Sequence, residues 1–88
     1  MERKRYGLIL FPETREAMMA EKEGRAHGFA VRIVPTPGKL VASCGFSLRY
    51  ELPGEEALYY FLQDLSVRTD GWYHVTRQGL CTEYERWK

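Results

Sequence analysis

The segment Tyr6-Gly-Leu-Ile-Leu-Phe11 is continuously apolar. An uninterrupted apolar run of this length is typical of a strand that is covered on both faces in the middle of a sheet. Residues 29–34 and 46–52 alternate between apolar and polar side chains, and residues 72–76 follow an Asp-Gly turn. These patterns predict three further strands around the first.

Two helices are predicted between these strands. Thr14 is a suitable N-cap for a helix that runs to about His27, and Gly28 is a suitable residue to end it. A second helix begins near Pro53, and its apolar residues recur at intervals of three and four from Leu58. The order βαββαβ predicts an α+β, ferredoxin-like fold, with two helices on one face of an antiparallel four-stranded sheet.

The chain has 88 residues, which suits one domain with one hydrophobic core. We expect the ferredoxin-like domain to occupy residues 1–76 and a C-terminal extension to occupy residues 77–88. In this extension, Leu80, Tyr84 and Trp87 are spaced so that a short helix would place them on one face.

The overall charge is nearly balanced. Thirteen basic and twelve acidic side chains give a net charge of +1, which is too little to attract phosphate backbones over a broad surface. The basic residues 3–5 are interpreted as a solvated flank, so we predict no nucleic-acid partner. No segment approaches the roughly 20 apolar residues of a membrane span, and the start of the sequence lacks the apolar core of a signal peptide. We expect a cytoplasmic protein with no membrane partner.

Two cysteines are present, Cys44 and Cys81. In a reducing cytoplasm we expect them to be free thiols. Cys44 lies in a connection rich in proline and glycine, directly before Gly45, and this position predicts a sulfur with little side-chain cover. Such a thiol can act as a nucleophile or a sulfur carrier. Cys81 lies in the weakly patterned extension and is interpreted as an incidental thiol, or as a resolving partner for Cys44 or for another chain.

The predicted topology places Cys44 beside the start of the first helix, because the first and third strands are central neighbours. Unpaired N–H groups at a helix start can stabilise a thiolate or a persulfide. Glu13 would compete for those groups, while Lys39 and Arg49 could supply positive charge. The geometry makes activation of the thiol possible.

Other kinds of site are not indicated. The two cysteines, His27 and His74 lack the spacings of a metal site, and no catalytic triad or glycine-rich phosphate loop is present. We therefore predict no metal and no cofactor. The aromatic residues exceed what one small core requires, and a surplus of this kind marks a protein-contact surface or a homodimer.

Several motifs match a known pattern: Tyr6–Pro12, Ala20–Lys22, Val34-Pro-Thr-Pro37, Ser43-Cys-Gly45 and Leu48-Arg49. Over about residues 6–76 the chain resembles the selenium/sulfur carrier-like family of small bacterial proteins. The resemblance implies a cysteine that carries sulfur or selenium as a persulfide-type adduct, and Cys44 is the matching position. The chain departs from the pattern at Glu23-Gly24, where a bulky aliphatic residue is expected, and in its C-terminal extension.

Two hypotheses follow. In the first, the protein accepts sulfur or selenium on Cys44 from a donor enzyme and passes it to an acceptor protein, which is transfer rather than turnover of a metabolite. The amides of Ser43 and Gly45 and the helix start at Thr14 would hold the charged adduct. In the second, the protein is a non-catalytic ferredoxin-like binding or regulatory module that acts through protein–protein contacts. Residues 35–45 would then form a lid or a contact surface. The fold alone favours neither.

Overall fold

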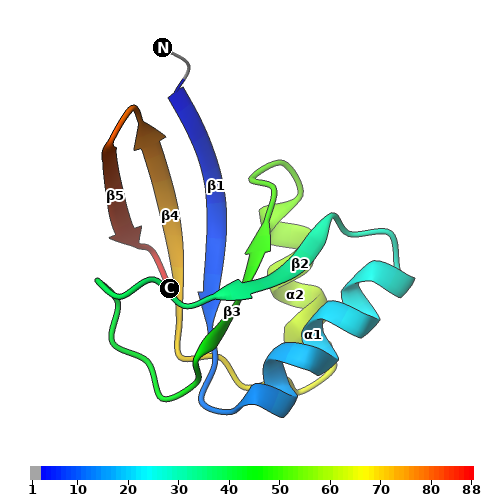
Figure 1. Ribbon diagram of the computed structural model, residues 1–88. Helices are drawn as coiled ribbons and strands as arrows, with labels where there is room; N and C mark the ends of the chain where they lie inside the picture. The colour runs from blue at the N-terminus through cyan, green and yellow to red at the C-terminus, as the bar shows by residue number, and fades with distance from the viewer. Residues whose placement is uncertain (1–2) are drawn as a thin grey trace.

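The first apolar segment forms strand β1 (Arg3–Leu10), which lies in the middle of an antiparallel sheet. The computed structural model describes residues 3–88. After β1 these residues form α1 (Thr14–Ala26), β2 (Val31–Pro35), β3 (Phe46–Tyr50), α2 (Glu55–Asp64), β4 (Gly71–Gln78) and β5 (Cys81–Arg86) (Figure 1). The strand order is β2-β3-β1-β4-β5, and every pair of neighbours is antiparallel. The predicted α+β class is confirmed.

The predicted number of strands is wrong: the sheet formed by residues 3–88 has five strands. The expected helix near the C-terminus is instead β5, which pairs with β4 from Gln78↔Cys81 to Tyr73↔Arg86. Gly79, with φ of 61°, occupies the first position of the two-residue turn between them, where a tight hairpin favours a positive φ. β4 therefore continues past residue 76, and most of the extension belongs to the same sheet.

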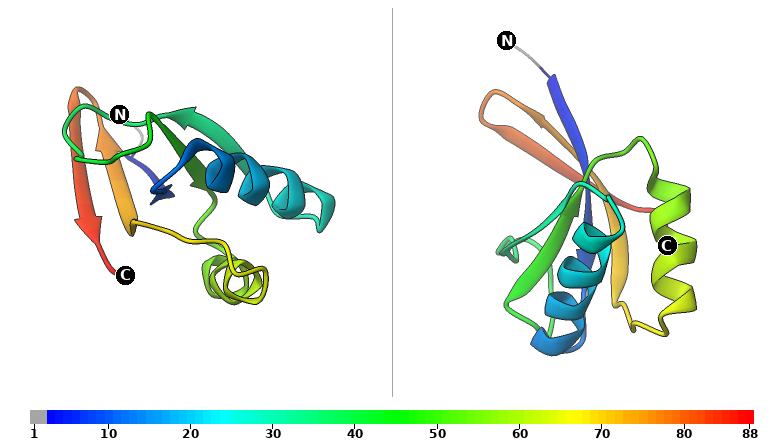
Figure 2. Two further views of the ribbon diagram at one scale, coloured as in Figure 1. Left: turned by 90° about the horizontal axis from the view of Figure 1, so that it is seen from below. Right: turned by 90° about the vertical axis from the view of Figure 1, so that its right-hand side faces the viewer.

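Both helices cover one face of the sheet, as Figure 2 shows. The core between the layers contains Ile9, Leu48 and Trp72 from the strands, and Leu58 and Leu62 from α2. α1 contributes a stripe of small buried residues, namely Ala17, Ala20 and Gly24. Neither helix in residues 3–88 has the length and apolar character that crossing a membrane requires.

The other face of the sheet has a smaller core. Its buried residues are Leu8, Leu10 and Val75, and Leu40 and Ala42 from the connection between β2 and β3 pack against them. Tyr6, Tyr73 and Tyr84 complete the cover. The connection, residues 36–45, therefore folds back over the sheet instead of projecting into solvent.

Candidate functional site

Cys44 lies at the end of the connection, two residues before β3 begins. The expectation of an uncovered sulfur is wrong, because only 4% of this residue is exposed. Cys44 belongs to the core on the helix side, whereas Leu40 and Ala42 of the same connection pack on the opposite face. The connection thus wraps around one end of the sheet and turns the thiol inward.

Two polar groups contact the sulfur. The Oγ1 atom of Thr14 lies 3.4 Å from Cys44 Sγ, and the backbone N–H of Phe46 donates to Sγ at 3.4 Å. Thr14 is the first residue of α1, so the start of the helix does lie next to the thiol, as the strand order requires. Hydrogen-bond donors directed at sulfur stabilise its negatively charged forms.

Thr36 holds the two ends of the connection together. Its backbone N–H donates to the carbonyl of Gly45 at 2.9 Å, and its hydroxyl donates to the carbonyl of Cys44 at 3.1 Å. The same hydroxyl lies 2.7 Å from the hydroxyl of Ser47, a residue with no exposed surface. Sequence reasoning missed this role. The signal in the sequence is the position of Thr36 between Pro35 and Pro37. Because neither proline has a backbone N–H, Thr36 is the residue of this segment that can donate hydrogen bonds.

The other predicted site residues do not all converge on the sulfur. Ser43 and Gly45 flank Cys44 and are exposed, and Lys39 is exposed in the turn closed by the Leu40 N–H. Arg49 points away, because its guanidinium lies 3.9 Å from the centre of the Tyr6 ring on the opposite face. The structure therefore brings Thr14 to the thiol and leaves Lys39 and Arg49 without contact to it.

Glu13 differs from its expected role as a competitor for the helix start. Its backbone forms the N-cap of α1, in place of the predicted N-cap Thr14. Its carboxylate pairs with Arg15 at 3.1 Å and with Arg68 at 3.4 Å. Both ion pairs are exposed, and such pairs contribute little to stability. Their effect here is to neutralise the carboxylate that directly precedes Thr14 in the sequence.

Cys81 is exposed and begins β5. Cys81 pairs with Gln78, which also pairs with Arg3 at one end of β1. Ser47, which is close to Cys44 in the sequence, pairs with Leu10 at the other end of β1. β1 spans about 23 Å, at roughly 3.3 Å per residue, and a disulfide requires Cα atoms about 4.4–6.8 Å apart. Cys81 is therefore not a resolving partner for Cys44 within this fold.

A second polar cluster lies between the sheet and α2. The Tyr50 hydroxyl donates to the Glu55 carboxylate, and Nε2 of His74 lies 2.6 Å from the same carboxylate oxygen. The Trp87 indole N–H donates to the Tyr50 oxygen at 3.3 Å. Burial, together with the Glu55 carboxylate, raises the pKa of Tyr50. The Tyr50 ring occupies the space above Gly7, where an added Cβ would lie 1.9 Å from it.

The region that contains Cys44 matches a known protein family. Residues 6–74 match the model of the family described as "Putative Se/S carrier protein-like". The chain belongs to this family. The matched region of this carrier-like family contains Cys44 and ends before Cys81. No curated protein and no solved structure matches the chain.

Metal ligands are not grouped in the part of the chain that the structure describes, residues 3–88. No three side chains from histidine, cysteine, aspartate and glutamate come together there as a metal ion would require. The candidate site of this carrier-like protein therefore consists of one thiol, one hydroxyl and one backbone amide. These groups suit chemistry at sulfur.

Proposed function

We propose that this protein carries sulfur or selenium on Cys44, as a persulfide or its selenium analogue. The observation that carries the proposal is the position of Cys44: it is the cysteine within the family-matched region, and its sulfur lies within 3.4 Å of a hydroxyl and an amide. Both groups can donate to a negatively charged adduct. Cys81 has no place in the family match.

Loading is a displacement at sulfur. The Cys44 thiolate attacks the outer sulfur of a persulfide on the donor enzyme, and the donor's own cysteine leaves as a thiolate. One S–S bond breaks and one forms, so the exchange needs no added oxidant or reductant. Attack by an acceptor thiolate on the outer sulfur of the Cys44 adduct then returns Cys44 to the thiolate. Thr14 and Phe46 would stabilise the charged sulfur in both states.

The burial of Cys44 means that the connection over residues 36–45 has to open before a donor reaches the sulfur. Thr36 and the packing of Leu40 hold it closed. Val41 and Phe46, which flank Cys44 in the sequence, have exposed apolar side chains, and they would offer a docking surface for a protein donor. Closure after loading would shield the adduct from reducing thiols in the cytoplasm, where we place the protein.

The ferredoxin-like assignment is part of this proposal and concerns the first four strands. β1 lies between β3 and β4, and β2 lies beyond β3, which is consistent with the split βαβ plan. The donor enzyme and the acceptor are proposed to be proteins. A homodimer is a further proposal, for which Met18, Met19 and Tyr60 provide exposed apolar surface on the helices.

The test is loading by a cysteine desulfurase with cysteine as the sulfur source, followed by intact mass measurement without reducing agent. The wild-type protein and Cys81→Ser should gain one or more sulfur atoms, and Cys44→Ser should not. Equal loading of Cys44→Ser and wild type would contradict the proposal. A wild-type protein that stays unmodified, although its opened form is alkylated at Cys44, would contradict it for this donor.

The burial of Cys44 favours one second candidate, a binding module with no covalent chemistry. In that case the thiol is a small core residue, and residues 36–45 form a protein-contact surface. This candidate predicts that Cys44→Ala folds normally and retains partner binding. The carrier proposal predicts that the same variant folds but neither accepts nor delivers sulfur.

A further inference from the structure

The sheet face opposite the helices is rich in cations. Because side chains alternate along a strand, residues on the same side as Leu8 can be identified from the strand register. On this face, which the connection over residues 36–45 covers in part, the cations are Lys4, Arg32, Arg49, Arg77 and Arg86. Most of the acids lie in the helical layer or at its start, at Glu13, Glu16, Glu21, Glu23, Glu55, Glu56 and Asp64. The net charge of +1 therefore averages over two layers of opposite sign.

Like charges face each other directly across this face of the sheet. Arg32 of β2 is the register partner of Arg49 of β3, and Lys4 of β1 is the partner of Arg77 of β4. Like charges in directly opposite positions destabilise a sheet. Within residues 3–88, none of these four side chains is in an ion pair. An anionic ligand on this surface would compensate both pairs.

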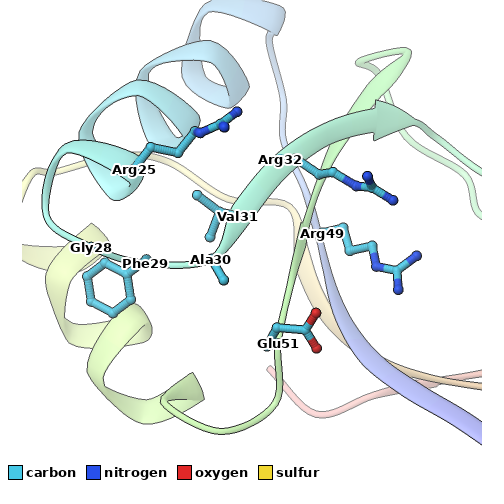
Figure 3. A pocket seen from close by; sticks show the side chains of 8 residues that line it. All are labelled: Arg25, Gly28, Phe29, Ala30, Val31, Arg32, Arg49 and Glu51. Atoms are coloured by element: carbon cyan, nitrogen blue, oxygen red, sulfur yellow. The ribbon is translucent and has the colours of Figure 1, made fainter.

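One of these pairs lines an open groove. Figure 3 shows Arg32, Arg49 and Glu51 extending toward the same side of β2 and β3. The groove has a volume of about 720 Å³, and its lining also includes Arg25 and the start of β2. Glu51 is the one acid in that lining, against three arginines. The groove therefore suits an anionic ligand that enters from the β2 edge.

Two half-buried tyrosines, Tyr6 and Tyr84, lie in the row between the two cation pairs, on either side of the buried Val75. Tyr6 is aligned with Val75, and Val75 is aligned with Tyr84. The Arg49 guanidinium stacks on the Tyr6 ring at 3.9 Å. Tyr6 and Tyr84 both pack against the buried cluster of Leu8, Leu10 and Val75. Flat aromatic and guanidinium surfaces between cations are suited to stacking by nucleobases.

We propose that the exposed part of this face binds single-stranded nucleic acid. The phosphates would contact the Arg32–Arg49 and Lys4–Arg77 pairs, which are about 14 Å apart along the strands at roughly 3.4 Å per residue. The bases would stack between them, near Tyr6. An acidic protein would satisfy the cations but not the stacking surfaces. This inference does not depend on Cys44. It differs from the prediction of no nucleic-acid partner, which rested on the net charge.

The experiment measures the anisotropy of a fluorescein-labelled, mixed-sequence 12-nucleotide RNA titrated with protein at low salt. With four phosphate contacts, the logarithm of the affinity should fall against the logarithm of salt with a slope of about −2.8. The double variant Arg49→Gln/Arg77→Gln should bind at least about tenfold more weakly, with a slope smaller in magnitude by about 1.4. Arg15→Gln/Lys22→Gln makes the same charge change on exposed residues of α1 and should bind within about twofold of wild type.

Further titrations identify the kind of ligand, and a melting temperature checks that the double variant is folded. A DNA single strand of the same sequence should bind, and a duplex should bind more weakly. Poly-glutamate that binds or competes as well as the RNA would overturn the proposal in favour of an acidic protein, and absence of RNA binding at low salt would overturn it outright. Removing one cation of each pair should leave the melting temperature unchanged or raise it, so weaker binding by the double variant would not reflect unfolding.

Discussion

The two regions that carry a cysteine are built differently. Cys81 begins a strand whose backbone is paired with β4 over six residue pairs, and its side chain is exposed. Cys44 ends a connection that lacks regular secondary structure, and its side chain is buried. A paired strand fixes its side chains in one orientation, whereas an irregular connection can move as a unit. The hidden thiol is therefore the one whose exposure the protein can control.

The contacts that hold each region support this contrast. The hairpin of β4 and β5 is joined to the core by Trp87, which stacks on His74 with ring centres 5.3 Å apart and donates to Tyr50. The connection over residues 36–45 depends on Thr36 and on a small apolar contact at Leu40 and Ala42. It should open at a free energy below that of global unfolding.

The largest expected difference is in native-state alkylation. Cys81 should react with a thiol reagent at the rate of an exposed cysteine, and Cys44 should react about 100-fold more slowly, for an opening free energy of about 2.7 kcal/mol. Mass-resolved alkylation kinetics on Cys44→Ser and Cys81→Ser measure the two rates separately. Equal rates would mean that the connection does not cover the thiol.

A variant in the connection over residues 36–45 should bring the alkylation rates of Cys44 and Cys81 closer together. Leu40→Ala removes half-buried packing from the connection and should speed Cys44 alkylation by about tenfold, for a loss of about 1.4 kcal/mol. The adjacent Val41→Ala is the matched control, because Val41 is fully exposed. Cys81 should react at the same rate in both variants. An equal effect of the two substitutions would show that packing by Leu40 does not hold the connection closed.

The free energy of unfolding should fall at alkaline pH because of Tyr50, the residue to which Trp87 joins the hairpin of β4 and β5. Tyr50 keeps its proton in the folded state above its usual pKa of 10.0, while an unfolded tyrosine loses it. The stabilisation is therefore complete below about pH 10 and falls by about 1.4 kcal/mol per pH unit above it. Urea unfolding followed by tryptophan fluorescence should show a shallower alkaline slope for Tyr50→Phe. Parallel slopes for the two proteins would contradict the raised pKa.

The smallest expected effect is on the lifetime of a Cys44 adduct. Thr14→Val removes the hydroxyl that lies 3.4 Å from Sγ, and it should shorten the lifetime of a Cys44 adduct by about fivefold, for about 1 kcal/mol. Thr14→Ser keeps the hydroxyl and should behave as wild type. The readout is the decay of the adduct mass after the donor is removed. A shorter lifetime in both variants would assign the effect to packing of the threonine methyl group.

Much of the fold follows from local patterns. The apolar segment at β1 and the alternation at β3 predict the central strands, and the extent of α1 is predicted to within about one residue at each end. β5 is missed because Leu80, Tyr84 and Trp87 have helical spacing, and their pairing with β4 depends on a turn at Gly79 that carries a weak hairpin signal. Long-range pairing overrides local periodicity here.

The site is predicted only in part. The strand order alone brings Thr14 to Cys44. The connection that carries the thiol is held in place by Thr36 and Leu40, whose partners are fixed only after the chain has folded. The opposing cation pairs are missed for the same kind of reason, because a shift of one residue in strand register would separate them.

The central claim is that the buried thiol, and not the exposed one, carries the transferred atom. It is tested most directly in the wild-type protein, where both cysteines compete for the same donor. After loading by a cysteine desulfurase, free thiols and adducts are alkylated, and peptide mapping locates the added sulfur. The account predicts the sulfur on the peptide that contains Cys44, and sulfur found chiefly on the peptide that contains Cys81 would contradict it.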